Sequence, residues 1–434
     1  MNIPETDAVR IVLVGGGFAG IALAKKLGKL PVQLVLVDRQ NYHGFQPLLY
    51  QVSTGGLEPD SIAYPIRKIL KRLPNFYFRW AEVESVDPGA KLLHTDRGTL
   101  SYDYLVWAAG TRTNYFGNET LRRHALPMKS VPQALDIRSL VLQNLEKADY
   151  SENEARRKAL MNFCIIGAGP TGVELAGAFA ELKRHVFPRD YRHLRVDEME
   201  IHLFEGNDRV LPPMSDTASA KARQFLEKLG VILHLNTRVE SYDGDRLRFG
   251  DGSEMRTANC IWTAGVTGAL VPGFPEASVD ARTNRLKVDS FNRVSGMDGV
   301  FAIGDSALMQ TEAYPNGHPQ MAQPALQQGA LLAENLDRML KGSPLRPFRY
   351  RNKGNMATVG RNKAVVDLPG WSFGGFMAWF IWMFVHLMSL VGFRNRVVVF
   401  FNWVYNYINY DKAARLIVRP YRKKPEKRTA MAEK

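Results

Sequence analysis

The sequence predicts an α/β protein with two Rossmann-like domains and a helical region at the C-terminus. Two glycine-rich turns, IVLVGGGFAG at 11–20 and FCIIGAGPTG at 163–172, each follow a short apolar run and precede a helical pattern. An aromatic and basic stretch from 371 to 408 marks the third part. Since such turns cradle a pyrophosphate, their repetition predicts two dinucleotides held face to face.

The first turn has the spacing G-x-G-x-x-G, at Gly15, Gly17 and Gly20. The first glycine permits the tight turn, the second lets the backbone approach a phosphate, and the third lets helix pack on strand. The next predicted strand, 33–37, is followed by Asp38. Because an acid at this place accepts hydrogen bonds from ribose hydroxyls, we assign Asp38 to the first dinucleotide.

The second turn repeats this spacing with three glycines, Gly167, Gly169 and Gly172. A strand predicted over 200–204 is followed by Glu205. The carboxylate of Glu205 should repel a 2′-phosphate, which favours NADH over NADPH as the ligand here. Arg209, four residues further on, works against that preference.

Three further apolar strands end in small or acidic residues. They end in Ala109-Gly110-Thr111, in Thr263-Ala264-Gly265 and in Gly304-Asp305. Small residues at a strand end allow the backbone to come close to a ligand. Asp305 is either a ligand contact or an ordinary helix N-cap; the other motifs favour the ligand contact.

The order of these motifs predicts one domain interrupted by another. The predicted parts are 8–115 for the first half of one dinucleotide-binding domain, 116–280 for an inserted second domain, 281–340 for the return to the first, and 341–434 for a membrane-anchoring region.

Composition limits the partners and the chemistry. The net charge is +14, yet no nucleic-acid-binding motif is present. We therefore expect the basic residues to bind an anionic membrane surface. Two cysteines without a C-x-x-C pair exclude a thiol–disulfide relay, and no His/Cys cluster has metal-ligand spacing. The N-terminal residues lack an apolar signal segment, so we expect the cytoplasmic side.

The aromatic stretch has two pieces, 376–393 and 397–408, separated by Gly392, Arg394, Asn395 and Arg396. It fits a core element, a single transmembrane helix, or a pair of helices lying in the membrane interface. The aromatic content favours the interfacial pair, and the basic run 421–428 would add attraction to an anionic leaflet. Two residues near this region, Lys363 and His386, have no assigned role.

The segment MAQPALQQG, 321–329, starts a helix after the Gly-Asp strand. Gln323 and Gln327 lie four residues apart and therefore on one helix face. An amide can hydrogen-bond a quinone carbonyl without being ionised, although an ordinary polar helix surface would look the same.

Taken together, the chain resembles the type II NADH:quinone oxidoreductases, non-pumping members of the glutathione-reductase-like flavoproteins with two dinucleotide-binding domains. The resemblance rests on YHGFQPLLYQVSTG (42–55), GAGPTGVELAG (167–177), AIGD (302–305) and A-Q-x-A-x-Q-x-G (322–329). It implies noncovalent FAD, NADH as substrate, a membrane quinone as acceptor, and a peripheral position on the cytoplasmic face of the cell membrane. It leaves homodimer formation open.

The resemblance also implies roles for individual residues. It implies FAD contacts by Gly15, Gly17, Phe18, Gly20, Asp38, Arg39, Gln46, Ala109, Gly110, Thr111, Gly304, Asp305, Ala322 and Gln323, and NADH contacts by Gly167, Gly169, Gly172, Glu174, Glu205, Ala264 and Gly265. Glu174 would orient the nicotinamide, and Gln323 and Gln327 would border the flavin and the quinone. The alternative function is a soluble NADH-dependent reductase of the ferredoxin or rubredoxin type, which would lack the aromatic tail.

Overall fold

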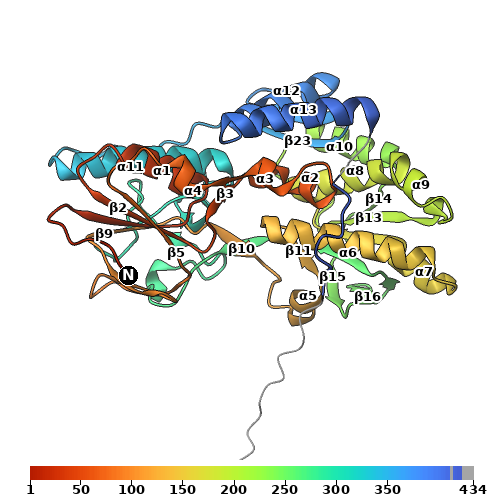
Figure 1. The fold of residues 1–434 in the computed structure, drawn as a ribbon, viewed down its shortest axis with the longest axis horizontal. Helices are drawn as coiled ribbons and strands as arrows, with labels where there is room; N and C mark the ends of the chain where they lie inside the picture. The colour runs from red at the N-terminus through yellow and green to blue at the C-terminus, as the bar shows by residue number, and fades with distance from the viewer. Residues whose placement is uncertain (411–413, 423–434) are drawn as a thin grey trace, which may run out of the picture.

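The computed structural model describes residues 1–410 and 414–422 and has the predicted α/β fold (Figure 1). Much of the basic run at 421–428 therefore lies outside the described residues. The first sheet is parallel, in the order β21-β9-β1-β2-β5 (Val300–Ala302, Tyr104–Trp107, Arg10–Val14, Gln33–Asp38, Phe76–Trp80). Residues 300–302 thus return to the sheet that begins at residue 10. The numerical domain limits remain a prediction.

Helices α1 (Phe18–Leu27) and α11 (Ala322–Leu340) cover one face of this sheet. A Cβ placed on Gly329 of α11 would lie 2.3 Å from the Ala19 carbonyl oxygen, so the two helices are in backbone contact. The remaining elements of residues 42–101 and 286–308 are β3 (Tyr42–Gly44), α2 (Leu49–Ser53), α3 (Pro59–Ile62), β4 (Ala63–Pro65), α4 (Ile66–Ile69), β6 (Val83–Asp87), β7 (Leu92–Thr95), β8 (Gly98–Ser101), β20 (Leu286–Lys287) and β22 (Ala307–Leu308). Of these, α2 packs against the second part.

The second sheet is also parallel, in the order β11-β18-β12-β13-β14 (Leu126–Pro127, Asn259–Trp262, Asn162–Ile166, Glu200–Phe204, Ile232–His234). Around it lie α5 (Glu119–His124), α6 (Val131–Asp149), α7 (Glu154–Met161), α8 (Pro170–His185), α9 (Phe187–Asp190), α10 (Asp216–Leu229), β15 (Val239–Tyr242), β16 (Arg246–Phe249) and β17 (Glu254–Arg256). The antiparallel ribbon of β10 (Thr111–Thr113) and β19 (Val266–Gly268) joins the two parts.

The C-terminal part differs from the expectation in one respect. Before its helices it forms an antiparallel sheet, β23-β24-β25 (Asn355–Gly360, Lys363–Leu368, Trp371–Gly375), so the first five residues of the aromatic stretch are a strand. Helix α12 (Phe376–Ser389) and helix α13 (Phe393–Asn409) follow. The first helix ends at Ser389 rather than Phe393, and the second begins at Phe393 rather than Val397, directly after Gly392, which has a φ of 90°.

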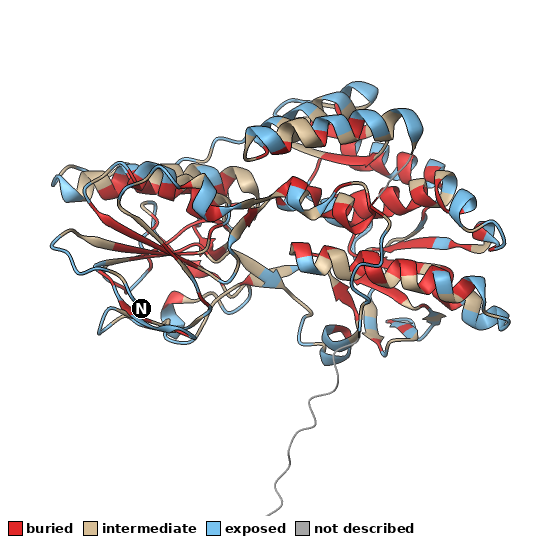
Figure 2. Cartoon of the chain, viewed as in Figure 1, coloured by how far each residue is buried: buried red, intermediate tan, exposed pale blue. Residues whose placement is uncertain are grey.

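Both helices pack on the body through a few residues only. Trp382 and Val399 are buried, whereas Phe380, Phe384, Phe401 and other large apolar side chains are exposed. Figure 2 shows the outer surfaces of α12 and α13 largely exposed above the buried sheets. Among the described residues, no helix combines the length and apolar character needed to cross a bilayer.

Candidate active site

The first glycine turn is shaped by contacts within the protein at two of its three glycines. Gly15 has a φ of 103°, and a Cβ there would lie 2.4 Å from the Ala108 carbonyl oxygen. A Cβ on Gly20 would lie 2.0 Å from the Gly15 carbonyl oxygen, so helix and strand touch. At Gly17 a Cβ would meet nothing within 4 Å. The space beside the second glycine is therefore open, so a phosphate can come close to the backbone there.

The turn is braced on both sides by side chains. Asp38 accepts hydrogen bonds from the backbone N–H of Gly16 and of Gln40, both at 2.7 Å. Burial raises the pKa of Asp38, and these bonds partly oppose the rise. His43 Nδ1 lies 2.9 Å from the Gly16 carbonyl oxygen, to which it donates. His43 was missed by the sequence analysis, although it lies in the quoted segment 42–55.

Asp305 and Thr111 share a buried electrostatic neighbourhood. Lys129 Nζ donates to Thr111 Oγ1 at 2.8 Å. Burial raises the pKa of Asp305, while Lys129 and Arg285 lower it. Gln328, another residue that sequence reasoning missed, accepts from the Gly304 N–H at 2.7 Å and fixes the turn before Asp305. A carboxyl and two cations therefore converge beside the end of β21.

The other residues predicted for this site lie at the carboxyl ends of the same strands or beside them. They are Phe18 at the start of α1, Arg39 after β2, Gln46 in a 3-10 turn, Ala109 and Gly110 after β9, Gly304 after β21, and Ala322 at the start of α11. A Cβ on Gly110 would meet nothing within 4 Å, as at the second glycine of the turn. These open backbone positions fit a dinucleotide laid across the strand ends.

The second glycine turn repeats the same construction. Gly167 has a φ of 102°, and a Cβ there would lie 2.7 Å from the Ala264 backbone. A Cβ on Gly172 would lie 1.9 Å from the Gly167 carbonyl oxygen, whereas one on Gly169 would meet nothing within 4 Å. At the same sheet edge, Gly265 has a φ of 75° and lies against the Phe116 ring. The predicted residues Ala264 and Gly265 thus pack beside this turn.

Glu205 holds the second glycine turn in the same way as Asp38 holds the first glycine turn. Its Oε2 accepts from the Ala168 N–H at 2.8 Å. Arg209 donates to the carbonyl oxygens of Pro212 and Met214, both at 2.9 Å, and pairs with Asp216. The guanidinium that could have offset the Glu205 charge is therefore engaged elsewhere.

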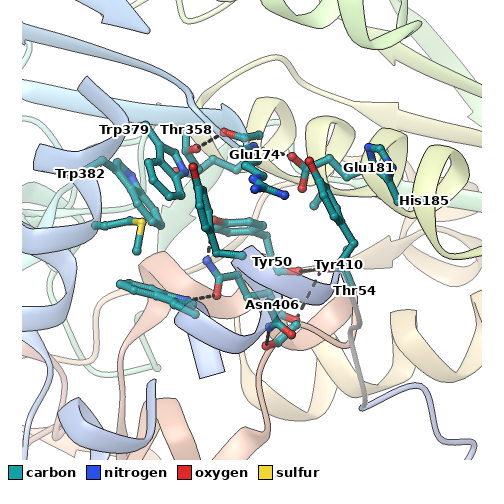
Figure 3. Close-up of a pocket in the computed structure, with 18 of the residues that line it drawn as sticks. Tyr50, Thr54, Glu174, Glu181, His185, Thr358, Trp379, Trp382, Asn406 and Tyr410 are labelled. Carbon is teal, nitrogen blue, oxygen red and sulfur yellow. Dashed lines mark hydrogen bonds between the residues drawn. The ribbon is translucent and has the colours of Figure 1, made fainter. Parts of the chain in front are cut away.

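A cavity of about 130 Å³ lies where α2, α8, β23 and the two C-terminal helices meet (Figure 3). Its lining is aromatic and partly ionisable: Tyr50, Gln51, Thr54, Glu174, Glu181, His185, Thr358, Arg361, Trp379, Trp382, Trp403, Asn406, Tyr407 and Tyr410 line it with others. An aromatic cavity with a few convergent polar groups suits a flat, mostly apolar ligand with polar oxygens.

Glu174 and Tyr50 are the polar centre of this cavity. Burial raises the pKa of Glu174 to about 8, while the Thr358 backbone and the Trp382 indole act in the opposite direction. Burial and the neighbouring Glu174 carboxyl raise the pKa of Tyr50 well above its ordinary value. Both groups therefore hold their protons at neutral pH. Gln51 links Tyr50 to α13, since its Nε2 donates to the Tyr50 hydroxyl and its Oε1 accepts from Trp403 at 2.7 Å.

Gln323 and Gln327 are not among the residues that line this cavity. Gln323 Nε2 donates to the Gly354 carbonyl oxygen at 2.8 Å, and its Oε1 accepts from the Lys353 N–H at 3.1 Å. Gln327 makes two hydrogen bonds of 3.0 Å with the Arg351 backbone. Both amides thus hold the segment that leads into β23.

The two residues without an assigned role lie in different settings. His386 stacks on Trp382 with ring centroids 4.1 Å apart, and its Nδ1 donates to the Trp382 carbonyl oxygen. Burial lowers the pKa of His386 to about 4, so its ring is neutral at pH 7. Lys363 begins β24, and its carbonyl oxygen accepts from Thr358 at 3.2 Å.

Comparisons with known proteins agree with this architecture. Residues 9–329 match the pyridine nucleotide-disulphide oxidoreductase family, and residues 352–409 match the NDH2 C-terminal domain. The chain is 36% identical over 411 residues to type II NADH:quinone oxidoreductase NdhA of Mycobacterium tuberculosis, covering 91% of this chain and 86% of that protein. It is 31% identical to a mitochondrial internal alternative NAD(P)H-ubiquinone oxidoreductase A1 of Solanum tuberosum, covering 91% and 86%.

Among solved structures, NDH2 of Plasmodium falciparum in complex with NADH superposes with a TM-score of 0.87 at 21% identity. The match covers 95% of this chain and 100% of that one. The C-terminal match at 352–409 includes the sheet and helices that close the cavity. The chain belongs to the type II NADH:quinone oxidoreductase family.

Proposed function

We propose that the chain oxidises NADH through noncovalently bound FAD and passes two electrons to a membrane quinone without pumping protons. The observation that carries this proposal is the pair of glycine turns, each braced by a carboxylate, beside a third site of different chemistry. When bound, FAD would accept a hydride from NADH and pass the two electrons to the quinone. The alternative, a soluble ferredoxin or rubredoxin reductase, is not favoured, because the chain carries the NDH2 C-terminal domain.

FAD is proposed for the first turn, with Asp38 toward its ribose and Asp305 toward its ribityl chain. The open backbone at Gly17 and Gly110 supports this assignment. NADH is proposed for the second turn, with Glu205 at its ribose. The test is direct: the purified protein should release FAD, rather than FMN, on denaturation, and should oxidise NADH with a soluble quinone analogue. Absence of either result would reject the proposal.

The quinone is proposed to enter the aromatic cavity, where Glu174 and Tyr50 would hold protons next to it. Glu174 is also near the NADH turn, because it lies two residues after Gly172 in α8. It can therefore serve the nicotinamide side and the quinone side of one site. Gln323 and Gln327 would act on this site through the segment 350–354 that they hold.

Replacing Gln323 with alanine should slow quinone reduction by about 10-fold, because two hydrogen bonds to the segment just before β23 are lost. Stopped-flow absorbance can follow NADH oxidation and quinone reduction as separate half-reactions. The NADH half-reaction should change less than the quinone half-reaction. Equal slowing of both would count against a role on the quinone side.

Replacing Glu205 with glutamine should raise kcat/KM for NADPH by roughly 10-fold, the effect of removing about 1.4 kcal/mol of repulsion. Glutamine keeps one oxygen that can accept from Ala168 and gives up the two bonds that the other oxygen accepts from Asn207. Steady-state rates with NADH and NADPH give the selectivity. Glu200→Gln, at the opposite end of β13, removes the same charge and should leave selectivity unchanged. Identical selectivity in both variants would contradict the assignment.

We further propose that the protein is peripheral, on the cytoplasmic face of the cell membrane, with α12 and α13 in the interface. Phe380 and Phe384 lie four residues apart on α12 and are 54% and 59% exposed. Replacing both with serine should lower partition onto vesicles at least ~10-fold, since two aromatic side chains no longer enter the bilayer. The matched control, Tyr150→Ser with Ile232→Ser, should bind vesicles as the wild type does. Equal partition of both double variants would exclude this face as the anchor.

A further inference from the structure

A second hollow, of about 280 Å³, lies on the first domain between the end of α1 and the turn after α4. Four cations line it, together with apolar side chains: Lys25, Lys68, Lys71 and Arg72, with Ile69, Leu70 and Leu73. A Cβ on Gly28 would lie 2.4 Å from Leu73 Cδ1, so the end of α1 and this turn are in tight contact. The hollow is therefore formed by packed segments and not by a loose loop.

The charges around the hollow are unbalanced. Its four cations are exposed, and none of them has a carboxylate within ion-pair distance among residues 1–410 and 414–422. Two acids of the surrounding helices are already paired, Glu334 of α11 with Lys26 at 2.5 Å and Asp60 of α3 with Arg394 at 3.8 Å. Four like charges around one small hollow repel one another, and an anion placed between them would relieve that repulsion.

The hollow adjoins the apolar helix pair through one side chain, Tyr64. Lys68 Nζ lies 5.2 Å from the centroid of the Tyr64 ring. A Cβ on Gly392 would lie 2.5 Å from Tyr64 Cε2, so the turn between α12 and α13 contacts the same ring. Phe393, the next residue, is 81% exposed. Figure 1 shows α1, α4, α12 and α13 on the same side of the molecule.

We propose that this hollow binds the phosphate group of an acidic phospholipid, so that the bilayer contacts the first domain as well as α12 and α13. The inference rests on the membrane attachment proposed above and adds a lipid-binding site to it. An acidic phospholipid matches both halves of the surface, since its phosphate meets the four cations while its acyl chains meet Phe393 and the partly exposed Ile69 and Leu73. A soluble phosphate would use only the charges.

The first experiment compares two triple variants of the full-length holoenzyme. Lys68→Gln/Lys71→Gln/Arg72→Gln removes three charges from the hollow, and Arg123→Gln/Arg156→Gln/Arg192→Gln removes three from exposed sites of the second domain. Partition is measured by sedimentation with vesicles of phosphatidylcholine, with and without one third phosphatidylglycerol, at low salt. The hollow variant should lose roughly 10- to 100-fold of its partition onto anionic vesicles and none onto neutral ones. Equal losses in both triple variants would overturn a specific site.

The second experiment reports contact directly and does not depend on affinity. Both native cysteines, Cys164 and Cys260, are buried, so a single introduced cysteine can be labelled selectively. An environment-sensitive fluorophore on Lys71→Cys should shift to shorter wavelength when anionic vesicles are added. The same fluorophore on Arg156→Cys should not shift. No shift at position 71, with the protein bound to vesicles, would show that the bilayer does not reach the hollow.

Two further measurements distinguish the lipid site from the proposed enzyme function and from a site for soluble phosphate. NADH oxidation with a soluble quinone analogue and no vesicles should be unchanged in the hollow variant; if the wild type lacks that activity, the proposed function fails while the lipid site can still be tested by partition. Calorimetry with glycerol phosphate tests the competing ligand. If glycerol phosphate binds the wild type but not the hollow variant, and vesicle partition is the same for both, the site is one for soluble phosphate and the lipid proposal is wrong.

Discussion

Replacing Gly177 with alanine should abolish most quinone reduction while sparing NADH oxidation by a soluble acceptor. A Cβ at position 177 would lie 1.7 Å from the Val359 carbonyl oxygen, so α8 and β23 are in backbone contact there. No side-chain rotation can relieve this clash, and the C-terminal sheet must move away from α8. Thr358 and Gly360, which line the cavity on either side of Val359, would move with it.

The measurement is a pair of steady-state rates, with a quinone analogue and with ferricyanide. We expect the quinone rate to fall at least ~10-fold, because overpacking a backbone contact costs on the order of 1–3 kcal/mol or more. The glycine turn at the start of α8 is two helical turns away, so the ferricyanide rate should stay within about 2-fold. Gly250→Ala, where a Cβ would lie 3.6 Å from its nearest neighbour, is the matched control. A normal quinone rate in Gly177→Ala would show that this helix–sheet contact does not shape the quinone site.

The sequence predicted the glycine turns well because their requirements are local. Steric demands at Gly15 and Gly167 and the strand-terminal acids Asp38 and Glu205 lie within short segments whose spacing sets their geometry. The fold class followed from the same segments. The contact between His43 and the first turn could not be predicted in this way, because His43 comes from a separate segment that the glycine spacing does not include.

The cavity could not be predicted, because its walls come from three distant parts of the chain. Tyr50, Glu174 and Trp382 meet there only through tertiary packing. The sequence analysis placed Gln323 and Gln327 beside the flavin and the quinone, and that role stays a prediction. The structure shows that both amides hydrogen-bond the backbone of residues 351–354. Helical periodicity gives the face on which a side chain lies and not what covers that face.

The C-terminal sheet was predictable in part. Arg361-Asn362 joins β23 to β24, and Asn362 adopts a φ of 60°, which asparagine tolerates in a tight hairpin. The helix pair itself was anticipated, and its second helix begins directly after Gly392.

Replacing Glu174 with glutamine should remove a large pH dependence from the stability of the protein. The pKa of Glu174 is raised to about 8 in the folded state, chiefly by burial, whereas an unfolded glutamate has a pKa of about 4.3. Folding therefore takes up a proton between these values. The folded state is most favoured below the unfolded pKa, loses stability as pH rises through this interval, and loses no more above the folded pKa.

Between pH 6 and pH 8 the wild type should lose roughly 2–3 kcal/mol of unfolding free energy from this group, at about 1.4 kcal/mol per pH unit. Urea unfolding of the holoenzyme at several pH values measures the slope. Glu174→Gln should lack this contribution and be the more stable protein at pH 8, while Glu240→Gln, at an exposed carboxylate, should keep the wild-type slope. Parallel slopes in wild type and Glu174→Gln would mean that Glu174 is ionised in the folded protein at neutral pH, and it could then not hold a proton next to the quinone.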